Sequence, residues 1–223
     1  MSSEPFVERS LDPNVVGFLH RPASSAMDAL VLTHGAGSNC RAPLLVDIAE
    51  AFAEAGILVL RCDLPYRQST PHGPPKPGGA ERDRQGLRHA VAVIRKLAPG
   101  RVTLGGHSYG GRQASMLAAS APGLVEALLL LSYPLHPPRQ PERLRVDHFP
   151  QLQTPALFVH GTRDPFGSEE EVERAQKLIL AETDLFLIVG AGHDLKVGKK
   201  IEPAGELPLA ERIRERWEKF LKM

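Results

Sequence analysis

A serine set between glycines is the feature of this sequence with the clearest capacity for covalent chemistry. The segment Gly106-His107-Ser108-Tyr109-Gly110 follows a short apolar run and begins a stretch rich in alanine and serine. A sharp strand-to-helix turn strains the backbone of its central residue, and neighbours without side chains two positions away make the strain tolerable. Ser108 would then stand at a helix N-terminus, where backbone N–H groups stabilise a developing negative charge. The alternative interpretation is a glycine-rich phosphate loop or a plain tight turn.

A serine nucleophile needs a general base, and the base needs an acid that orients it. Asp164 stands a few residues after the apolar run 155–159, and His193 follows the run 184–189 in the segment GAGHD. Taken singly, Asp164 could be a turn former and His193 a helix cap. Together they follow Ser108 in the order serine, acid, histidine, each after a later apolar run, which is the order of a nucleophile-elbow site. The pattern therefore predicts Ser108, Asp164 and His193 as the catalytic residues.

Another glycine-rich segment, HGAGSN at 34–39, follows the apolar run 28–33. Attack on a carbonyl creates an oxyanion, which two preorganised N–H donors stabilise. We expect one donor from the backbone of Tyr109, directly after the nucleophile, and the other from Ala36 in this segment. Gly35 is the next candidate and is expected to contact substrate. His34 is predicted to hold the segment in place by hydrogen bonds.

The elements that must position these residues are short apolar runs, which alternate with longer amphipathic stretches along almost the whole chain. Runs of this length, nearly continuous in apolar character, are typical of strands covered on both faces. The alternation predicts a doubly wound α/β fold, with a mostly parallel sheet of about seven or eight strands flanked by helices. Strands are expected at 15–21, 28–33, 57–62, 101–104, 125–131, 155–159 and 184–189, with a further partner at 6–8, and helices at about 43–55, 80–97, 109–120, 168–181 and 207–222.

Two proline-rich segments interrupt this alternation, at 65–79 and at 134–150. Both leave the carboxyl end of an expected strand, where connections form the ligand crevice of an open α/β sheet, although a rigid surface connection also explains either segment. Arg67 lies in the first segment, which contains no acid, and Arg112 lies four residues after Ser108. A guanidinium facing the site would hold a carboxylate bidentately and select acidic acyl groups, and Arg67 is the better candidate of the two. The alternative is that these arginines bind backbone carbonyls or reach solvent.

Composition argues against several other classes of protein. The chain has 223 residues, 42% of them hydrophobic and 24% charged, and a net charge of +1. These values are typical of one globular domain, here expected to span 1–223, and give no support to nucleic-acid binding. No apolar run reaches the ~18 residues of a membrane span, the first residues lack the pattern of a signal peptide, and neither the cysteines nor the histidines have metal-ligand spacing. We expect a cytoplasmic protein that needs no cofactor or metal and binds neither nucleic acid nor membrane.

Four motifs, HGAG, GHSYGG, HGTRDPFG and GAGHD, each after an expected strand, resemble those of the α/β-hydrolase superfamily over roughly 15–222. The chain is most similar to the small lidless members, close to dienelactone-hydrolase-like proteins. The stretches LRCDLPYRQ and HSYGGRQAS also resemble a group of small hydrolase-fold proteins, one of them related to a subunit of a eukaryotic histone-acetylation complex. Dienelactone hydrolases use a cysteine nucleophile, whereas this chain has Ser108. The segment 134–150, where larger members insert a helical cap, is too short for a cap domain, so we expect a shallow, open pocket.

The resemblance and the residues together imply a serine hydrolase acting on an ester, a thioester or a related acyl bond of a small molecule. A small peptidase is an alternative, although no second domain is expected that would select peptides. An alternative from another class is a non-catalytic binding module, which the resemblance to a chromatin-complex subunit would allow. Strained elbow geometry together with a complete set of catalytic residues counts against a module that only binds.

Overall fold

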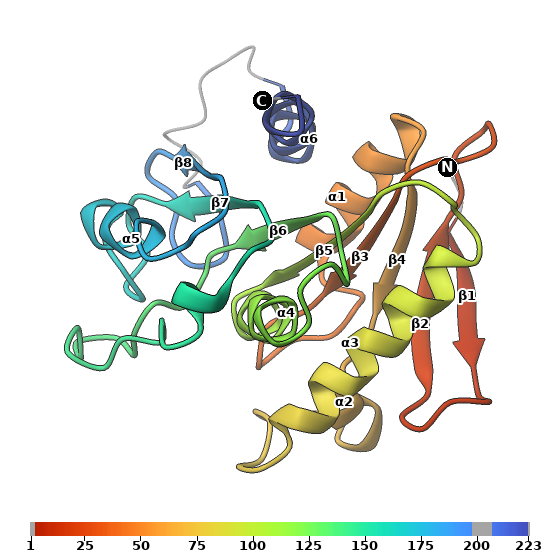
Figure 1. Ribbon diagram of the computed structural model, residues 1–223, viewed down its shortest axis with the longest axis horizontal. Coiled ribbons are helices and arrows are strands. Elements are labelled where there is room, and N and C mark those ends of the chain that lie inside the picture. The colour runs from red at the N-terminus through yellow and green to blue at the C-terminus, as the bar shows by residue number, and fades with distance from the viewer. Residues whose placement is uncertain (1–2, 198–206, 223) are drawn as a thin grey trace.

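The computed structural model describes residues 3–197 and 207–222, which form one eight-stranded sheet with helices on both faces (Figure 1). The strands are β1 (Ser3–Glu8), β2 (Val15–His20), β3 (Ala29–Thr33), β4 (Leu58–Cys62), β5 (Val102–His107), β6 (Ala127–Leu131), β7 (Ala156–Gly161) and β8 (Thr183–Ile188). The helices are α1 (Pro43–Glu54), α2 (Pro65–Ser69), α3 (Ala80–Arg95), α4 (Tyr109–Ser120), α5 (Glu169–Gln176) and α6 (Leu209–Phe220), with a 3₁₀ helix at Phe149–Gln151.

The strand order, β1-β2-β4-β3-β5-β6-β7-β8, contains the switch point that a binding crevice needs. From β3 the chain passes to β4 on one side and later to β5 on the other, so the connections after β3 and β5 leave in opposite directions. Strands β3 to β8 run parallel, and β2 pairs antiparallel with both of its neighbours, β1 and β4. Thr33 pairs with Gly106 and His107 with Leu131, so β3, β5 and β6 end at nearly the same level. Their connecting segments therefore meet at one edge.

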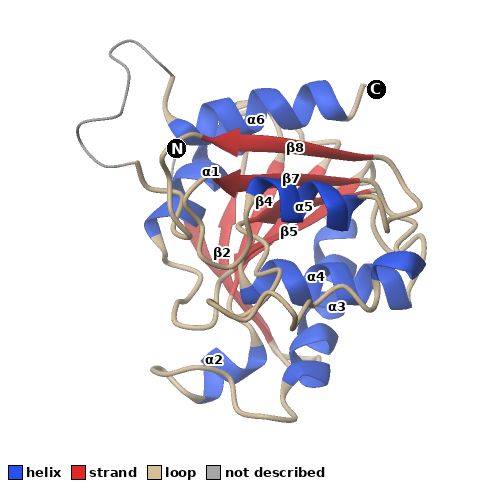
Figure 2. Cartoon of the chain, turned by 90° about the vertical axis from the view of Figure 1, so that its left-hand side faces the viewer, coloured by secondary structure: helices blue, strands red, loops and turns tan. Residues whose placement is uncertain are grey.

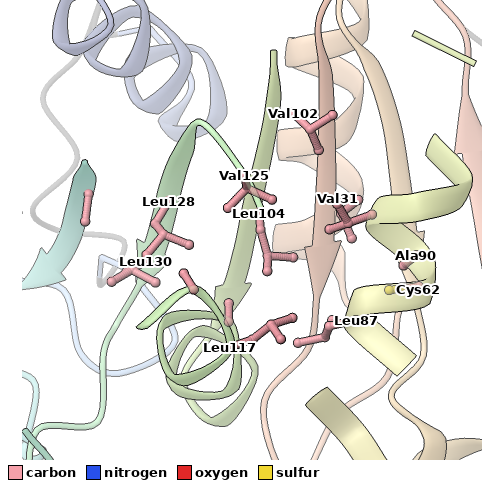
Figure 3. Close-up of a cluster of buried hydrophobic side chains, with 14 of the residues drawn as sticks. Val31, Cys62, Leu87, Ala90, Val102, Leu104, Leu117, Val125, Leu128 and Leu130 are labelled. Carbon is pink, nitrogen blue, oxygen red and sulfur yellow. The ribbon is translucent and has the colours of Figure 1, made fainter. Parts of the chain in front are cut away.

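Each face of the sheet has its own apolar core because side chains alternate along every strand. In β6, Leu128 and Leu130 face a core shared with α3 and α4, part of which Figure 3 shows, whereas Leu129 and Leu131 face a core shared with α1 and α6. Figure 2 shows α6 beside β8, on the opposite side of the sheet from α3 and α4. With both faces covered, the central strands are buried throughout, which explains their continuous apolar runs.

The α/β fold and every strand predicted from the sequence are present, with ends that shift by at most a few residues. Helix α5 is shorter than expected: it ends at Gln176, and the following turn carries Ile179 into the core while Leu180 is 74% exposed. The first proline-rich segment contains helix α2, which we did not predict, and the second leads into the equally unpredicted 3₁₀ helix and holds no larger insertion. Among the helices in the described ranges, none has the length and apolar character that a membrane crossing requires.

Candidate active site

The turn between β5 and α4 places Ser108 in a backbone conformation that residues with side chains rarely adopt. Ser108 has φ 51° and ψ −116°, and its N–H donates to the Leu131 carbonyl of β6 at 2.8 Å. A Cβ on Gly106 would come within 2.6 Å of the backbone of Gly110, and one on Gly110 within 2.6 Å of the His34 carbonyl oxygen. Only glycine fits at both positions. Because Gly106 and Gly110 have no side chains, the backbones around them approach closely enough for the sharp turn.

The three residues predicted to act together form a chain of hydrogen bonds with His193 in the middle. Ser108 Oγ is 2.8 Å from Nε2 of His193, and Nδ1 of His193 is 2.8 and 3.0 Å from the two carboxylate oxygens of Asp164. A neutral imidazole with its proton on Nδ1 donates to the carboxylate and accepts the hydroxyl proton of Ser108 on Nε2. Because Asp164 follows β7 and His193 follows β8, the parallel strands carry both side chains to the edge where Ser108 stands.

Asp164 has a fully buried side chain that the turn after β7 holds in place. Its Oδ1 accepts the N–H of Phe166 at 2.9 Å, and its own N–H donates to the Gly161 carbonyl at 3.0 Å. The His160 ring lies alongside, with Nδ1 3.9 Å from Asp164 Oδ2 and Nε2 2.8 Å from the Gly167 carbonyl oxygen. Because a carbonyl oxygen only accepts, Nε2 carries the proton of a neutral His160, whose Nδ1 then has none to offer. The Asp164 carboxylate therefore accepts a hydrogen bond from the imidazole of His193 and not from that of His160.

His193 is held by two residues that the sequence did not single out. The Phe166 ring stacks on the imidazole with centroids 4.1 Å apart and an interplanar angle of 30°. Nε2 of His107 lies 2.7 Å from the His193 carbonyl oxygen, to which it donates. Burial lowers the pKa of His107, so this ring is neutral near pH 7 and adds no charge beside the site. These contacts fix the ring and the backbone of His193 independently of Ser108.

The segment 34–39 passes directly beside Ser108, since a Cβ on Gly35 would lie 3.4 Å from the Cβ of Ser108. The Gly35 carbonyl oxygen accepts from Nδ1 of His34 at 2.9 Å and from the N–H of Ser38 at 3.0 Å. Nδ1 of His34 carries the proton because its Nε2 accepts the N–H of Leu64 at 3.1 Å, and burial lowers the pKa of the ring. His34 thus has the structural role predicted for it.

The two backbone N–H groups predicted as oxyanion donors belong to peptide units whose carbonyls are bound by other groups. Because the peptide is planar and trans, the Ala36 N–H points away from the held Gly35 carbonyl. The Ser108 carbonyl accepts the N–H of Arg112 at 3.0 Å, the first bond of α4. The N–H of Tyr109, at the first position of that helix, has no acceptor within the helix. Both N–H groups are thereby oriented before any substrate binds.

The guanidinium of Arg67 is bound by the surrounding loops rather than presented to the site. Nε donates to the Ser38 carbonyl at 2.7 Å and Nη1 to that of Thr70 at 2.9 Å. Nη2 donates to the carbonyls of Ala36 at 3.0 Å and Gly73 at 2.8 Å, and the residue is 5% exposed. Two roles were considered for Arg67. These contacts favour the one in which it binds backbone carbonyls, and not the one in which it holds a substrate carboxylate.

Arg112 differs from Arg67 in having a buried Nε with no hydrogen-bond partner among the described residues. It lies one helical turn after Ser108, and side chains on a helix lean toward its N-terminus. Burial and the charge of Arg112 together lower the pKa of Arg145. They also lower the pKa of His148, to about 4. Two guanidinium groups therefore lie near each other where 134–150 meets α4, an arrangement that favours an anion.

The residues that the structure describes contain no group of three or more histidine, cysteine or acidic side chains placed to hold a metal ion. Both cysteines are free and buried. Burial raises the pKa of Cys40 to about 12 and raises that of Cys62 further, so neither is a thiolate at neutral pH. Ser108 remains the candidate nucleophile of this site.

A sequence model of the alpha/beta hydrolase domain matches residues 26–221, and the chain belongs to this family. Among solved structures, the fold is similar to that of dienelactone hydrolase from Anabaena variabilis, with a TM-score of 0.75 and 21% identity over 99% of this chain and 97% of that one. It is also similar to XC6422 from Xanthomonas campestris, a serine hydrolase without a lid, with a TM-score of 0.72 and 16% identity over 97% and 95% of the two chains. Est1E from Butyrivibrio proteoclasticus matches over the full length of both chains, with a TM-score of 0.73 and 17% identity. The protein is a small α/β hydrolase.

Proposed function

We propose that the protein is a serine hydrolase that cleaves an ester, a thioester or a related acyl bond through an acyl-enzyme. The observation that carries this proposal is the unbroken chain of hydrogen bonds from Ser108 through His193 to Asp164, with 2.8 Å at each link. The strained elbow of Ser108 supports it, since a module that only binds has no need of such a conformation.

The proposed reaction begins when Ser108 Oγ attacks the substrate carbonyl and its proton passes to Nε2 of His193. Asp164 stabilises the imidazolium, and the N–H groups of Ala36 and Tyr109 bind the oxyanion of the tetrahedral intermediate. Collapse of this intermediate breaks the acyl bond, and Nε2 returns the proton to the departing alcohol or thiol. Water then attacks the acyl-enzyme with His193 as base, which releases the acid and restores the serine.

Fluorophosphonate labelling tests the nucleophile directly. The wild-type protein should carry one label on Ser108, and Ser108→Ala should lose both the label and turnover of p-nitrophenyl esters or acyl thioesters by several orders of magnitude. Ser120→Ala, at the other end of α4, removes a hydroxyl that donates to the Leu117 carbonyl and serves as the matched control. A wild-type protein without label at Ser108, or an alanine variant that keeps its turnover, would leave the non-catalytic binding module as the better interpretation.

We further propose that the substrate is a small acyl compound that carries a carboxylate, bound by Arg112. The place of Arg112 one helical turn after Ser108 and the nearby charge of Arg145 support this choice, because a guanidinium fork binds a carboxylate through two charge-assisted hydrogen bonds. Arg112→Gln should raise KM for monoanionic esters about tenfold or more and leave KM for neutral esters of equal size unchanged. Arg67→Lys should affect both sets alike, since Arg67 binds loop carbonyls. An equal effect of Arg112→Gln on both sets would remove the basis for an anionic substrate.

A further inference from the structure

A buried carboxylate on α3 connects the two halves of the proposed oxyanion site. Asp83 is 0% exposed, its Oδ1 accepts the N–H of Tyr66 at 3.0 Å, and its Oδ2 accepts the hydroxyl of Tyr109 at 2.8 Å. Among the described residues it forms no ion pair. Burial raises the pKa of Asp83, and an isolated carboxylate is costly to bury unless its acceptors are used. Both oxygens of Asp83 are used, on two different segments.

Tyr66 extends this connection to the segment 34–39. Its hydroxyl proton is shared between the Ala36 carbonyl oxygen at 2.8 Å and the Gly35 carbonyl oxygen at 3.2 Å. The Gly35 carbonyl shares a peptide unit with the Ala36 N–H, and the Ala36 carbonyl belongs to the next unit, so the hydroxyl of Tyr66 holds the donor's own peptide unit and the one after it. The rings of Tyr66 and Tyr109 also pack edge to face, with centroids 5.9 Å apart. The Asp83 carboxylate thus fixes Tyr66, which orients the Ala36 N–H. It also fixes the side chain of Tyr109, whose backbone N–H is the second proposed donor.

We propose that Asp83 and Tyr66 are positioning residues that hold the Ala36 and Tyr109 N–H groups at the separation an oxyanion requires. This role rests on the proposed serine hydrolase function. Neither side chain needs to touch the substrate: Asp83 acts through Tyr66 and Tyr109, and Tyr66 acts through the carbonyls beside Ala36. The Ala36 carbonyl also accepts from Arg67, so loss of the Tyr66 hydroxyl weakens this arrangement without abolishing it.

Two variants test the role. Tyr66→Phe keeps the ring and the N–H that Asp83 accepts but removes the hydroxyl, and Asp83→Asn keeps the shape but offers an acceptor to only one of its two donors. Glu126→Gln is the matched control, because Glu126 also accepts a backbone N–H, that of Val102 at 2.6 Å, at the start of β5 and at the opposite end of the strand from Ser108. Each protein is assayed for kcat, KM, thermal unfolding and inhibition by a trifluoromethyl ketone, which forms a hemiketal oxyanion on the serine.

We expect Tyr66→Phe and Asp83→Asn to lower kcat by about tenfold to a hundredfold with KM nearly unchanged, the loss typical of misplaced or missing oxyanion donors. The inhibition constant of the trifluoromethyl ketone should rise in parallel with the loss in kcat/KM, because it mimics the transition state. A merely structural role would lower the unfolding temperature without moving either quantity in the folded protein.

The role is overturned if the folded variants match Glu126→Gln in kcat and in ketone inhibition while the wild-type protein is labelled at Ser108. If Asp83→Asn does not fold, Tyr66→Phe alone decides, since it leaves both acceptors of Asp83 occupied. A wild-type protein that takes no fluorophosphonate at Ser108 overturns the proposed function, and this role with it. The two failures are therefore distinguished by the labelling of the wild-type protein.

Discussion

Two aspartates lie near His193, one in space and one in the sequence. At the scale of single residues, their burial and their partners differ sharply. Asp164 is fully buried and accepts from Nδ1 of His193, whereas the Asp194 side chain is 59% exposed and lies 3.6 Å from Nζ of Lys196. We expect Asp164→Asn to lower kcat by about 10⁴, because an amide can donate to Nδ1 and so favours the tautomer that cannot take the serine proton. Steady-state kcat, measured with the unfolding temperature as a check on folding, tests this.

Asp194→Asn is the matched control for that variant. It changes the same chemical group one residue from His193, at an exposed carboxylate that accepts the backbone N–H of Lys196. Its kcat should stay close to that of the wild-type protein. Comparable losses of kcat in the two variants would mean that the negative charge of nearby carboxylates supports His193, and not the hydrogen bond to Asp164 in particular.

The sequence made the meeting of Ser108, Asp164 and His193 predictable because each follows an apolar run in a fixed chain order. It did not make their supporting residues predictable. Phe166 stacks on a ring 27 positions later in the chain, and Tyr109 reaches a carboxylate 26 positions earlier, contacts that depend on how the elements pack. Arg67 shows the same limit, since its position in the sequence favoured it over Arg112 as the arginine that faces the substrate, whereas its guanidinium binds loop carbonyls.

At the scale of elements, the junction of β3, β5 and α4 determines whether the elbow can form. A Cβ on Gly110 would lie 2.6 Å from the His34 carbonyl oxygen and from Cγ2 of Thr33, and a backbone carbonyl in a strand connection cannot turn aside as a side chain can. Gly110→Ala should therefore separate α4 from β3, lower the unfolding temperature by about 2–12 °C and abolish turnover. Differential scanning calorimetry and the ester assay measure the two effects.

A glycine with room around it provides the comparison. Gly79 precedes α3 with φ −80°, and the nearest atom to a Cβ there is the Lys76 carbonyl oxygen at an ordinary 3.4 Å. Gly79→Ala should leave stability unchanged or raise it slightly, since alanine narrows the unfolded ensemble. If Gly110→Ala were as stable as this control, close packing at the elbow would not be what requires glycine there.

The elements themselves were largely predictable because strands buried on both faces must be continuously apolar. Helix α2 was not, since proline-rich stretches are usually read as loops. It begins with Pro65 at its first position, where the missing N–H costs nothing, and that preference was the signal available in the sequence. The early end of α5 had no comparable signal, because the turn that follows is set by burial of Ile179 against the sheet.

At the scale of the whole molecule, covering both faces of the sheet buries histidines as well as apolar residues. His20 accepts from Nε of Arg61 at 2.8 Å, and His148 pairs with Ser115 Oγ at 2.8 Å. Burial, followed by the charge of a neighbouring arginine, lowers the pKa of each to about 4 from the ordinary value of 6.5. Between these values the unfolded chain binds more protons than the folded protein. The free energy of unfolding therefore rises with pH across this window and falls as the pH is lowered from 6.5 toward 4.

Each such histidine adds a slope of at most about 1.4 kcal/mol per pH unit to the free energy of unfolding between pH 4 and 6.5. Replacing both, as in His20→Gln with His148→Gln, should flatten the dependence on pH even where it lowers stability at pH 7 by disturbing the bonds to Arg61 and Ser115. Urea unfolding at several pH values in this window measures the slope. His72→Gln, on an exposed loop, controls for the loss of an imidazole as such. A double variant that unfolds with the same pH slope as His72→Gln would show that acid sensitivity comes from other groups and that these two histidines accept protons equally well in both states.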